Sequence, residues 1–537
     1  MDNARIADQL DTLAGLLELA EANPYSARAY RRAAETVRSA PAPVADLVRS
    51  GRVRQLRGIG SRIEAKLREL VETGAIAELA ELERELAPDM VGFGRYLGLS
   101  AKRTLELARE LGVRTAGEFR EAALSGRLQS ARGVGPRTEA RLLEALARAE
   151  QPRPRQGLLL NRARELVAAI ARGVDGEMAG DARRWRDNCD HLAVVCAADD
   201  PRPVFTRFVQ LPQIVALLSA EERRVVGLTV EGVPIELVVA APERFGTALV
   251  ECTGAEAWVD PLRPLPDAPD EEAVFKALGI PWVPPELREP GAGEPPPRLL
   301  ELDDIRGDLH AHTTWSDGRA SVEEMGRAAR DRGYAYLAIC DHTPAVGAVP
   351  GLSADDVRRQ GEEIAAANDL LAPFRILRGI ECDILPDGRL DLPDDVLAEL
   401  DWVQASVHGG QRMPARQMTD RVLEAIRNPY VRCLSHPTGR YINRRPENAL
   451  DLDELFPVAL EHGVALEING LTPRLDLSAE HARDAIAAGI PLVCSTDAHS
   501  VAGLDNMQYS VATARRAGAR PEDVLNTGNP FRTPRSA

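Results

Sequence analysis

The feature that most constrains the fold is a pattern repeated after residue 300, in which a short apolar run stops at a histidine or a carboxylate. Helical patterns separate these runs, and alternation of this kind is typical of βα units with a parallel sheet. Because the strands of a parallel barrel all end on one face, the side chains that follow them converge there. Six of the nine histidines in the chain occupy such positions. The runs stop at Asp308, His310, His312, Asp341, His342, Glu381, His408, His436, Asp497 and His499.

These side chains offer imidazole and carboxylate donors and no thiolate, and together with Asp317 they are too many for one ion. Such a donor set suits Zn, Mn or Fe in an open hydrolytic site better than a closed structural zinc site. We therefore expect two or three divalent metal ions as cofactors, with Mn and Zn favoured. A cluster of this kind lowers the pKa of a bound water and clamps a phosphoryl group, which is the chemistry of phosphoester hydrolysis.

The chain of 537 residues is too long for one hydrophobic core and should form three or four domains. Its seven cysteines form no CxxC pair and no apolar run reaches membrane-spanning length, so we expect a cytoplasmic protein with reduced thiols and no membrane contact. The net charge of −16 disfavours a nucleic-acid partner at first sight. Residues 1–150, however, carry 24 basic and 22 acidic side chains, so the acidic excess lies in the rest of the chain.

Residues 1–150 have helical periodicity that is interrupted by Gly-apolar-Gly turns, each followed by an amphipathic helix. The two clear copies are LRGIGSRIEAKLREL at 56–70 and ARGVGPRTEARLLEAL at 131–146, and a looser copy lies at 96–111. Glycine lets backbone N–H groups approach a phosphate closely and the helix dipole assists, as in helix-hairpin-helix units. We expect these turns to hold a DNA backbone without reading its bases, through Gly58, Gly60, Gly133 and Gly135.

The motifs DLHAHTTWSDG, CDHT, GIECDI, SVHGG, SHPTGR and STDAHS resemble, in order and spacing, the polymerase-and-histidinol-phosphatase (PHP) domain. The resemblance implies a distorted (β/α)7 barrel that holds three metals. It implies one site from His310, His312, Glu381 and Asp497, a second from Glu381, His408 and His436, and a third from Asp317, His342 and His499. Arg440, which follows His436 by four residues, matches a family residue that holds substrate phosphate.

The first glycine turn and its flank NPYSARAYRRAA resemble the small lyase domain of family X DNA polymerases. This resemblance makes Lys66 the Schiff-base lysine and makes Tyr30 and Arg62 neighbouring phosphate contacts. A desolvated lysine amine can attack an aldehyde to form a Schiff base. The chain has only three lysines, so arginine would have served a purely structural role at this position. The alternative is an exposed helix lysine without a chemical role.

Over nearly its whole length the chain resembles bacterial family X DNA polymerases with a C-terminal PHP domain. The stretch AGDARRWRDNCDHLAVV then corresponds to the polymerase palm. The family's two paired aspartates fall on His191 and Ala193, and only Glu236 still matches the third carboxylate. Alanine ligates nothing and Mg²⁺ prefers oxygen to imidazole, so we expect nucleotidyl transfer to be lost.

Three further aspartates bear on this expectation. Asp181 stands where the family has a small serine, and there it would repel a triphosphate. A shifted register that uses Asp187 and Asp190 places them three residues apart, so a strand would point them to opposite faces.

The predicted architecture is multidomain, with N-terminal all-α helix-hairpin-helix domains, a central α+β domain resembling a polymerase palm, and a C-terminal α/β PHP barrel. The predicted boundaries are a lyase-like domain at 1–85, a helical fingers-like domain at 86–155, a degenerate palm and thumb at 156–283, a proline-rich linker at 284–300 and the PHP domain at 301–537.

We expect a metal-dependent DNA phosphoesterase that acts as a 3′→5′ exonuclease, an abasic-site nuclease or a 3′-end-cleaning enzyme in base excision repair. Its partner would be gapped or nicked duplex DNA with 3′ ends, bound by a monomer. Three alternatives remain open at this point: an active gap-filling polymerase with a PHP exonuclease, a small-molecule PHP phosphatase, and a DNA-binding scaffold without catalysis.

Overall fold

The computed structural model describes residues 3–19, 24–40, 42–79, 110–113, 121–122, 125, 127, 157–347 and 349–528. The contacts within the chain form two compact units. The first comprises residues 1–157, 172–176 and 198–239, and the second comprises 158–171, 177–197 and 240–537. Among the described residues, no helix combines the length and the apolar character that crossing a bilayer requires.

The first unit begins with helices whose apolar side chains share one core. Among these helices are α1 (Asn3–Leu19), α2 (Pro24–Ser39), α3 (Val44–Arg49) and α4 (Ser61–Thr73). Helix α4 buries Ile63, Leu67 and Leu70, whose spacing of four and three residues places them on one face. It is preceded by Gly60 and ends at Gly74, whose φ of 81° is the left-handed conformation of a helix C-cap. The predicted turn followed by an amphipathic helix is therefore present at 58–73.

The first unit also contains antiparallel strands, and these pack on the N-terminal helices. They are β5 (Ile214–Ala220), β6 (Arg224–Thr229) and β7 (Pro234–Ala240), preceded by helix α12 (Arg202–Gln210). Val215 and Leu228 join the core of the N-terminal helices. The loop before α4 is attached to the β6–β7 turn, because the N–H of Arg57 donates to the carbonyl of Val230 and its guanidinium lies 2.7 Å from Glu231.

The second unit contains a short α+β segment that precedes the barrel in sequence. Its elements are β1 (Leu158–Leu159), α10 (Leu160–Val174), β2 (Glu177–Ala179), α11 (Gly180–Arg183), β3 (Asn188–Cys189), β4 (Leu192–Ala197), α13 (Phe245–Thr253), α14 (Glu256–Val259) and α15 (Glu271–Leu278). Strand β2 pairs antiparallel with β4, and β1 pairs antiparallel with β3.

A buried ion cluster holds this segment together. The two guanidinium nitrogens Nη1 and Nη2 of Arg183 each lie 2.8 Å from an oxygen of Glu271. The fully buried Arg288 pairs with the same carboxylate. Loss of Glu271 would leave a buried cation without its partner, which is far costlier than the loss of a surface ion pair.

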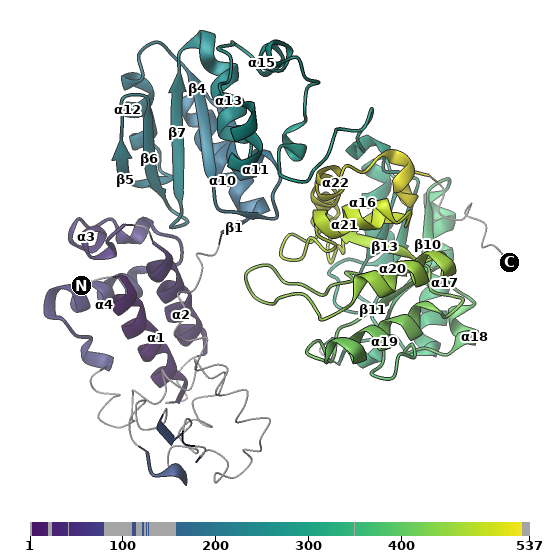
Figure 1. The fold of residues 1–537 in the computed structure, drawn as a ribbon. Coiled ribbons are helices and arrows are strands. Elements are labelled where there is room, and N and C mark those ends of the chain that lie inside the picture. Colours follow the sequence, from purple (N-terminus) through teal and green to yellow (C-terminus); the bar gives the residue numbers. More distant parts are fainter. Residues whose placement is uncertain are drawn as a thin grey trace. The chain divides into compact units, whose positions relative to one another are not determined.

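The rest of the second unit is built around a parallel barrel, drawn in green to yellow in Figure 1. The seven-stranded sheet has the order β14-β13-β12-β11-β10-β9-β8, so strands that are consecutive in sequence are neighbours in the sheet. The strands are β8 (Gly307–Ala311), β9 (Tyr336–Ile339), β10 (Arg375–Asp383), β11 (Trp402–Ser406), β12 (Cys433–Leu434), β13 (Ala465–Asn469) and β14 (Leu492–Ser495). Apart from Arg375 and Arg378, every strand residue is buried. This burial on both faces explains why the runs are continuously apolar instead of alternating.

Helices follow the strands and cover the outside of the barrel (Figure 1). They are α16 (Val322–Asp331), α17 (Ala354–Leu371), α18 (Asp394–Leu397), α19 (Ala415–Ile426), α20 (Leu452–His462), α21 (Ala479–Ala487) and α22 (Met507–Arg516). Ser321 and Ser353 start α16 and α17 with reciprocal capping boxes. The N–H of His312 donates to the carbonyl of Ala498 over 2.9 Å, so the segment after β14 meets the end of β8. This nearly closes the sheet and confirms the predicted multidomain architecture with a C-terminal α/β barrel.

Candidate metal centre

The barrel brings the histidines and carboxylates singled out in the sequence to the carboxyl ends of its strands. His310 lies in β8 and Glu381 in β10, whereas His408, His436 and Asp497 each follow a strand by two residues. The remaining members, His312, Asp317, His342 and His499, lie in the loops that follow β8, β9 and β14. Donor atoms form three overlapping groups, and within each group the atoms lie within 4.8 Å of one another. The groups are His312, Asp317, His342 and His499; His310, His312 and Asp497; and His342, Glu381 and His408.

The first site implied by the resemblance to the PHP domain is assembled from β8, β10 and the loop after β14. Nε2 of His312 lies 3.1 Å from both Nε2 of His310 and Oδ1 of Asp497. Oε2 of Glu381 lies 3.4 Å from Nε2 of His310 and 3.7 Å from Nε2 of His312. Donors bound at about 2.1 Å from one ion are themselves about 3–3.5 Å apart. His310, His312 and Asp497 therefore have the spacing that a single cation requires, and Glu381 lies beside both histidines.

The second site uses the other oxygen of Glu381. Oε1 of this carboxylate lies 2.7 Å from Nε2 of His436 and 3.4 Å from Nε2 of His408. Nδ1 of His342 lies 3.0 Å from Oε2. Glu381 thus faces histidines on both of its oxygens, as a carboxylate shared between two ions would.

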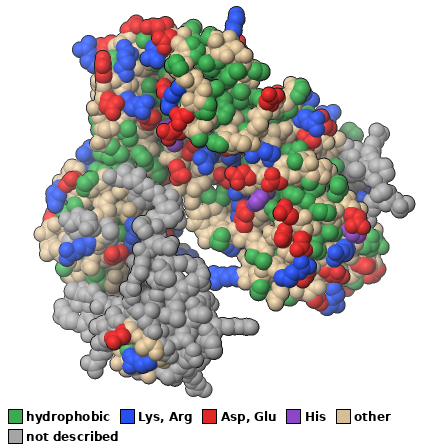
Figure 2. Space-filling model, viewed as in Figure 1, with side chains coloured by type: hydrophobic (Ala, Val, Ile, Leu, Met, Phe, Trp, Pro, Cys, Tyr) green, Lys and Arg blue, Asp and Glu red, His purple; other side chains and the backbone are tan. Residues whose placement is uncertain are grey.

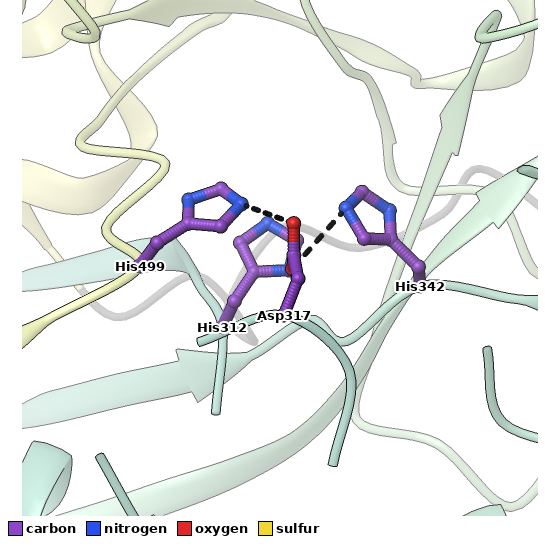
Figure 3. A group of neighbouring side chains, drawn as sticks. All are labelled: His312, Asp317, His342 and His499. Carbon is purple, nitrogen blue, oxygen red and sulfur yellow. Dashed lines mark ion pairs between the residues drawn. The ribbon is translucent and has the colours of Figure 1, made fainter. Parts of the chain in front are cut away.

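The third site is shown in Figure 3, where the Asp317 carboxylate lies between two imidazoles. Its oxygens lie 3.2 Å from Nε2 of His499 and 3.6 Å from Nε2 of His342. Nδ1 of His312 is 3.9 Å from the same carboxylate, so His312 belongs to this group through one nitrogen and to the first through the other. Nδ1 of His312 is also buried and has no hydrogen-bond partner in the described part of the chain. A neutral imidazole has a lone pair on one nitrogen only, and a cation at either group would take up that of His312, so the residues fit a metal cluster.

The charges of the centre are coupled. Burial would raise the pKa of Asp317, but the hydrogen bond from His499 outweighs it and lowers the pKa to about 2. Burial opposes the charge on His499, yet Asp317 and Asp497 raise its pKa to about 9. Burial together with His342 and His499 lowers the pKa of His312 to about 3. Without a metal, protons on some histidines balance the carboxylates, and divalent cations can take the place of those protons.

Figure 2 shows Asp and Glu side chains gathered around a histidine on the visible face of the molecule. Such a surface repels a DNA phosphate unless cations neutralise it.

Two residues of the centre have positive backbone φ, 28° at His436 and 52° at Asp497. Non-glycine residues in that region carry strain that is typical of functional sites.

Glu467, a residue that the sequence patterns did not single out, fixes two of the histidines. It is fully buried in β13 and lies 2.6 Å from Nδ1 of His310. It also accepts hydrogen bonds from the Ser435 hydroxyl, the N–H of His436 and the Ser495 hydroxyl, at 2.9, 2.6 and 2.5 Å. Contact with a carboxylate places the imidazole proton on Nδ1 of His310 and leaves Nε2 facing the cluster. The run VALEIN carries the same signal as the other strands, an apolar stretch that stops at a carboxylate.

Asp308 and Asp341, which also end apolar runs, hold loops and belong to none of the donor groups found among the described residues. Asp308 accepts hydrogen bonds from Thr496 and thereby ties β8 to the end of β14. Asp341 accepts from the N–H and hydroxyl of Thr313 and from Gln360. These carboxylates shape the rim on which the donors lie.

Arg440 lies beside the centre, and its guanidinium already has partners. Nε donates to the carbonyl of Arg474 over 2.9 Å, and Nη2 donates to the carbonyl of Leu475. A second arginine, missed in the sequence, lies closer to the donors. Nε of Arg474 is 3.9 Å from Oδ2 of Asp497, and its Nε and Nη1 are buried without a hydrogen-bond partner among the described residues. Arg474 is therefore also a candidate to hold an anion at the centre.

The N-terminal site residues that can be placed belong to one turn and the helices beside it. Gly58 has φ of 87° and Gly60 precedes α4, and both glycines are exposed, as is Arg62. Tyr30 is buried in the helical core. The exposure of both glycines leaves the turn open to a phosphate. Gly133 and Gly135 lie outside the described residues.

The Lys66 ammonium lies 3.0 Å from Glu78 and 3.4 Å from Glu69. Burial opposes its charge, but the hydrogen bond and charge of Glu78, with Glu69, raise the pKa of Lys66 above its usual value. A Schiff base requires the neutral amine, so these carboxylates hold Lys66 in the unreactive form.

None of the residues aligned with the polymerase centre belongs to a donor group found in the described part of the chain. His191 is exposed, and Ala193 is buried in β4 opposite Ala179. Glu236 of β7 lies 2.7 Å from Arg224. Among the residues that the structure describes, every donor group able to hold a metal lies in the barrel.

Asp181 differs from its expected role, because its carboxylate is buried and does not face a nucleotide site. It pairs with Arg184 and accepts hydrogen bonds of 2.8 Å from the N–H groups of Asp190 and His191. Asp181 thus neutralises an arginine of the palm-like motif and fixes the turn before β4.

Known proteins resemble this chain both in parts and over its length. The helix-hairpin-helix domain family matches residues 1–76, and the PHP domain family matches residues 308–441. DNA polymerase/3′-5′ exonuclease PolX of Bacillus subtilis (strain 168) is 34% identical over 549 residues, which cover 96% of this chain and 96% of that protein. A probable phosphatase of Acetivibrio thermocellus is 31% identical over 36% of this chain and 78% of its own length. A probable phosphatase of Syntrophotalea carbinolica is 29% identical over 41% of this chain and 90% of its own length.

Proposed function

The chain belongs to the PolX family, and from this premise we propose that its barrel is a metal-dependent DNA phosphodiesterase that acts on 3′ ends and at abasic sites. Gapped or nicked duplex DNA in base excision repair is the proposed substrate, and Mn²⁺ or Zn²⁺ the proposed cofactor. The observation that carries the proposal is the set of donor groups at the strand ends, which are linked by His312 and His342 and in which Glu381 faces histidines on both of its oxygens.

The side chains of the centre would have three roles in hydrolysis: binding the metal ions, fixing the tautomer of a metal-binding histidine and orienting the phosphodiester. His310, His312, Glu381 and Asp497 would hold one ion, with His408 and His436 for a second and Asp317, His342 and His499 for a third. When bound, divalent ions supply Lewis-acid activation of water and stabilisation of the charge on a transferred phosphoryl group. Glu467 keeps the His310 proton on Nδ1, so that Nε2 stays available to the centre. Arg440 and Arg474 would orient the phosphodiester from the protein side.

The helix-hairpin-helix turn would supply sequence-independent DNA binding. The exposed residues Gly58 and Gly60 precede α4, so a DNA phosphate there would meet backbone N–H donors and the positive end of the helix. Arg62 on the first turn of α4 adds a positive charge. This mode explains how a chain of net charge −16 would bind DNA.

The proposal is tested by incubating the purified chain with Mn²⁺ and a 3′-labelled gapped duplex. We expect nucleotides to be removed from the 3′ end, and we expect the double variant His310→Ala, His312→Ala to abolish the removal. His462→Ala is the matched control, because this histidine ends α20 outside the donor groups. Cleavage at an unchanged rate in the double variant would refute the proposal.

Loss of polymerase activity is the second part of the proposal. Its support is that Ala193 offers no donor and that Asp181 is taken up by Arg184. In a His310→Ala background, which suppresses degradation, a primed template with all four nucleotides should show no extension. Extension of the primer in this variant would refute the loss and support the alternative of an active gap-filling polymerase.

A small-molecule phosphatase is the competing function, and the matches to two probable phosphatases favour it. The two functions separate in one comparison. If the chain hydrolyses sugar or amino-alcohol phosphates faster than a gapped duplex, the phosphatase is correct and the N-terminal turn is irrelevant to turnover.

A further inference from the structure

Asp187 connects the palm-like segment to the arginine beside the metal centre. It precedes β3, and Oδ2 of its carboxylate lies 2.9 Å from Nη2 of Arg440. Nη1 of Arg516, at the end of α22, lies 3.9 Å from Oδ1. The next residue adds a second contact to the same loop, because the amide of Asn443 donates to Oδ1 of Asn188 over 3.2 Å. All of these residues belong to the second compact unit.

The contacts of Arg440 form a continuous path to a candidate metal ligand. Its Nε and Nη2 are held by the carbonyls of Arg474 and Leu475 and by Asp187, which leaves Nη1 as the remaining donor group. The backbone that accepts from Arg440 carries the Arg474 side chain, whose Nε is 3.9 Å from Asp497. Fixing the Arg440 guanidinium therefore also fixes the loop that presents Arg474.

We propose that Asp187 is a positioning residue of the phosphoesterase site, which orients Arg440, and through residues 474–475 Arg474, to receive the phosphate of the substrate. The inference rests on the proposed function of the barrel. It also gives the palm-like segment a role, because this segment supplies a carboxylate to the phosphoesterase site of the barrel.

The surroundings suit a fixed ionic contact. Burial would raise the pKa of Asp187, but Arg516, Arg440 and Arg186 outweigh it and hold the pKa below its usual value, so the carboxylate is ionised. Arg516 is itself held by Glu289 at 2.9 Å. The side chains of Asp187 and Arg440 are only 21% and 13% exposed, so solvent does little to screen their attraction.

The test compares Asp187→Asn with the matched control Glu286→Gln. Glu286 makes a similar ion pair, since it lies 2.8 Å from Nε of Arg515, which is on helix α22 together with Arg516. Glu286 has no ion pair with Arg440. In the Mn²⁺-loaded full chain, Asp187→Asn should raise KM for a 3′-labelled gapped duplex about five- to tenfold with little change in kcat, because a phosphodiester carries its charge before and during the reaction. Glu286→Gln should leave both constants unchanged.

Two further comparisons make the outcome decisive. Adding Asp187→Asn to Arg440→Gln should raise KM no further, and Asp187→Glu should restore part of the wild-type KM. If Asp187→Asn fails to fold, which a melting curve reports, Asp187→Glu takes its place in the comparison with Arg440→Gln. Equal KM in Asp187→Asn and Glu286→Gln, or faster cleavage by Asp187→Asn, overturns the inference.

A binding measurement separates this inference from the proposed function. Inorganic phosphate should bind the Mn²⁺-loaded wild type more tightly than Asp187→Asn by a similar factor, as measured by calorimetry. If the wild type binds phosphate in this way but leaves DNA intact, the proposed DNA substrate is wrong and the role of Asp187 stands. If phosphate binds both proteins equally, the role of Asp187 is refuted even when DNA is cleaved.

Discussion

Replacing Glu467 by glutamine tests how the protein fixes the tautomer of a metal-binding histidine. Oε1 of Glu467 faces Nδ1 of His310 at 2.6 Å and the hydroxyl of Ser495 at 2.5 Å. Oε2 faces the hydroxyl of Ser435 and the backbone N–H of His436. Every one of these partners can donate a hydrogen bond, so the NH₂ of a glutamine must replace one acceptor by a donor.

The two orientations of the amide have different costs. An NH₂ group next to the His436 N–H would place two donors together, because a backbone N–H cannot reverse its role. Turned the other way, the NH₂ faces His310, whose imidazole can move its proton from Nδ1 to Nε2. That shift removes the lone pair that His310 offers to the centre. The second orientation should prevail, and the loss should appear as weakened metal binding.

The magnitude follows from the loss of an outer partner of a metal-binding histidine. Removing such a partner typically weakens metal affinity about 10–100-fold, or about 1.4–2.7 kcal/mol. Calorimetric titration of the metal-free chain with Mn²⁺ measures it, and Glu454→Gln is the control, because that carboxylate pairs with exposed Arg416 on the barrel surface. Equal Mn²⁺ affinity in Glu467→Gln and Glu454→Gln would show that this carboxylate does not set the state of His310.

Three other outcomes are expected. Mn²⁺ affinity should rise between about pH 6 and about pH 9, because His499, whose pKa is raised to about 9, must lose its proton before Nε2 can bind a cation; calorimetry that finds the same affinity throughout contradicts this. Glu78→Gln should increase borohydride trapping of a 5′-deoxyribose-phosphate end on Lys66, since the neutral amide no longer favours the ammonium held 3.0 Å away; trapping that survives Lys66→Ala rules this lysine out as the nucleophile. Glu271→Gln should destabilise the second unit by about 3–5 kcal/mol in chemical denaturation, because the fully buried Arg288 loses its carboxylate; a change below about 1 kcal/mol would mean that water or another side chain replaces it.

The barrel and its donors could be predicted from the sequence because the information is local. A strand that is buried on both faces is a continuous apolar run, and a residue directly after it must lie at the strand end, whatever the rest of the chain does. Glu467 could have been found in the same way from the run VALEIN. Arg474 follows that run at a greater distance, in a loop whose course no local pattern fixes.

The partners of charged side chains could not be predicted, because tertiary contacts choose them. Asp181 was expected to face a nucleotide, but folding of the turn before β4 buries it against Arg184. Asp187 contacts Arg440 although more than half of the barrel sequence separates them along the chain. Lys66 contacts Glu78, which lies beyond the end of the helix that carries the lysine. Each of these contacts changes the chemistry that the residue type alone suggests.

A crystal of the full chain soaked in Mn²⁺, with the anomalous signal of the metal measured, tests the central claim most directly. The account predicts two or three anomalous peaks at the strand ends, with Glu381 contacting more than one of them and His310, His312 and Asp497 around the first. Peaks found only at surface carboxylates, with the imidazoles of the centre still hydrogen-bonded to its carboxylates, would contradict the account.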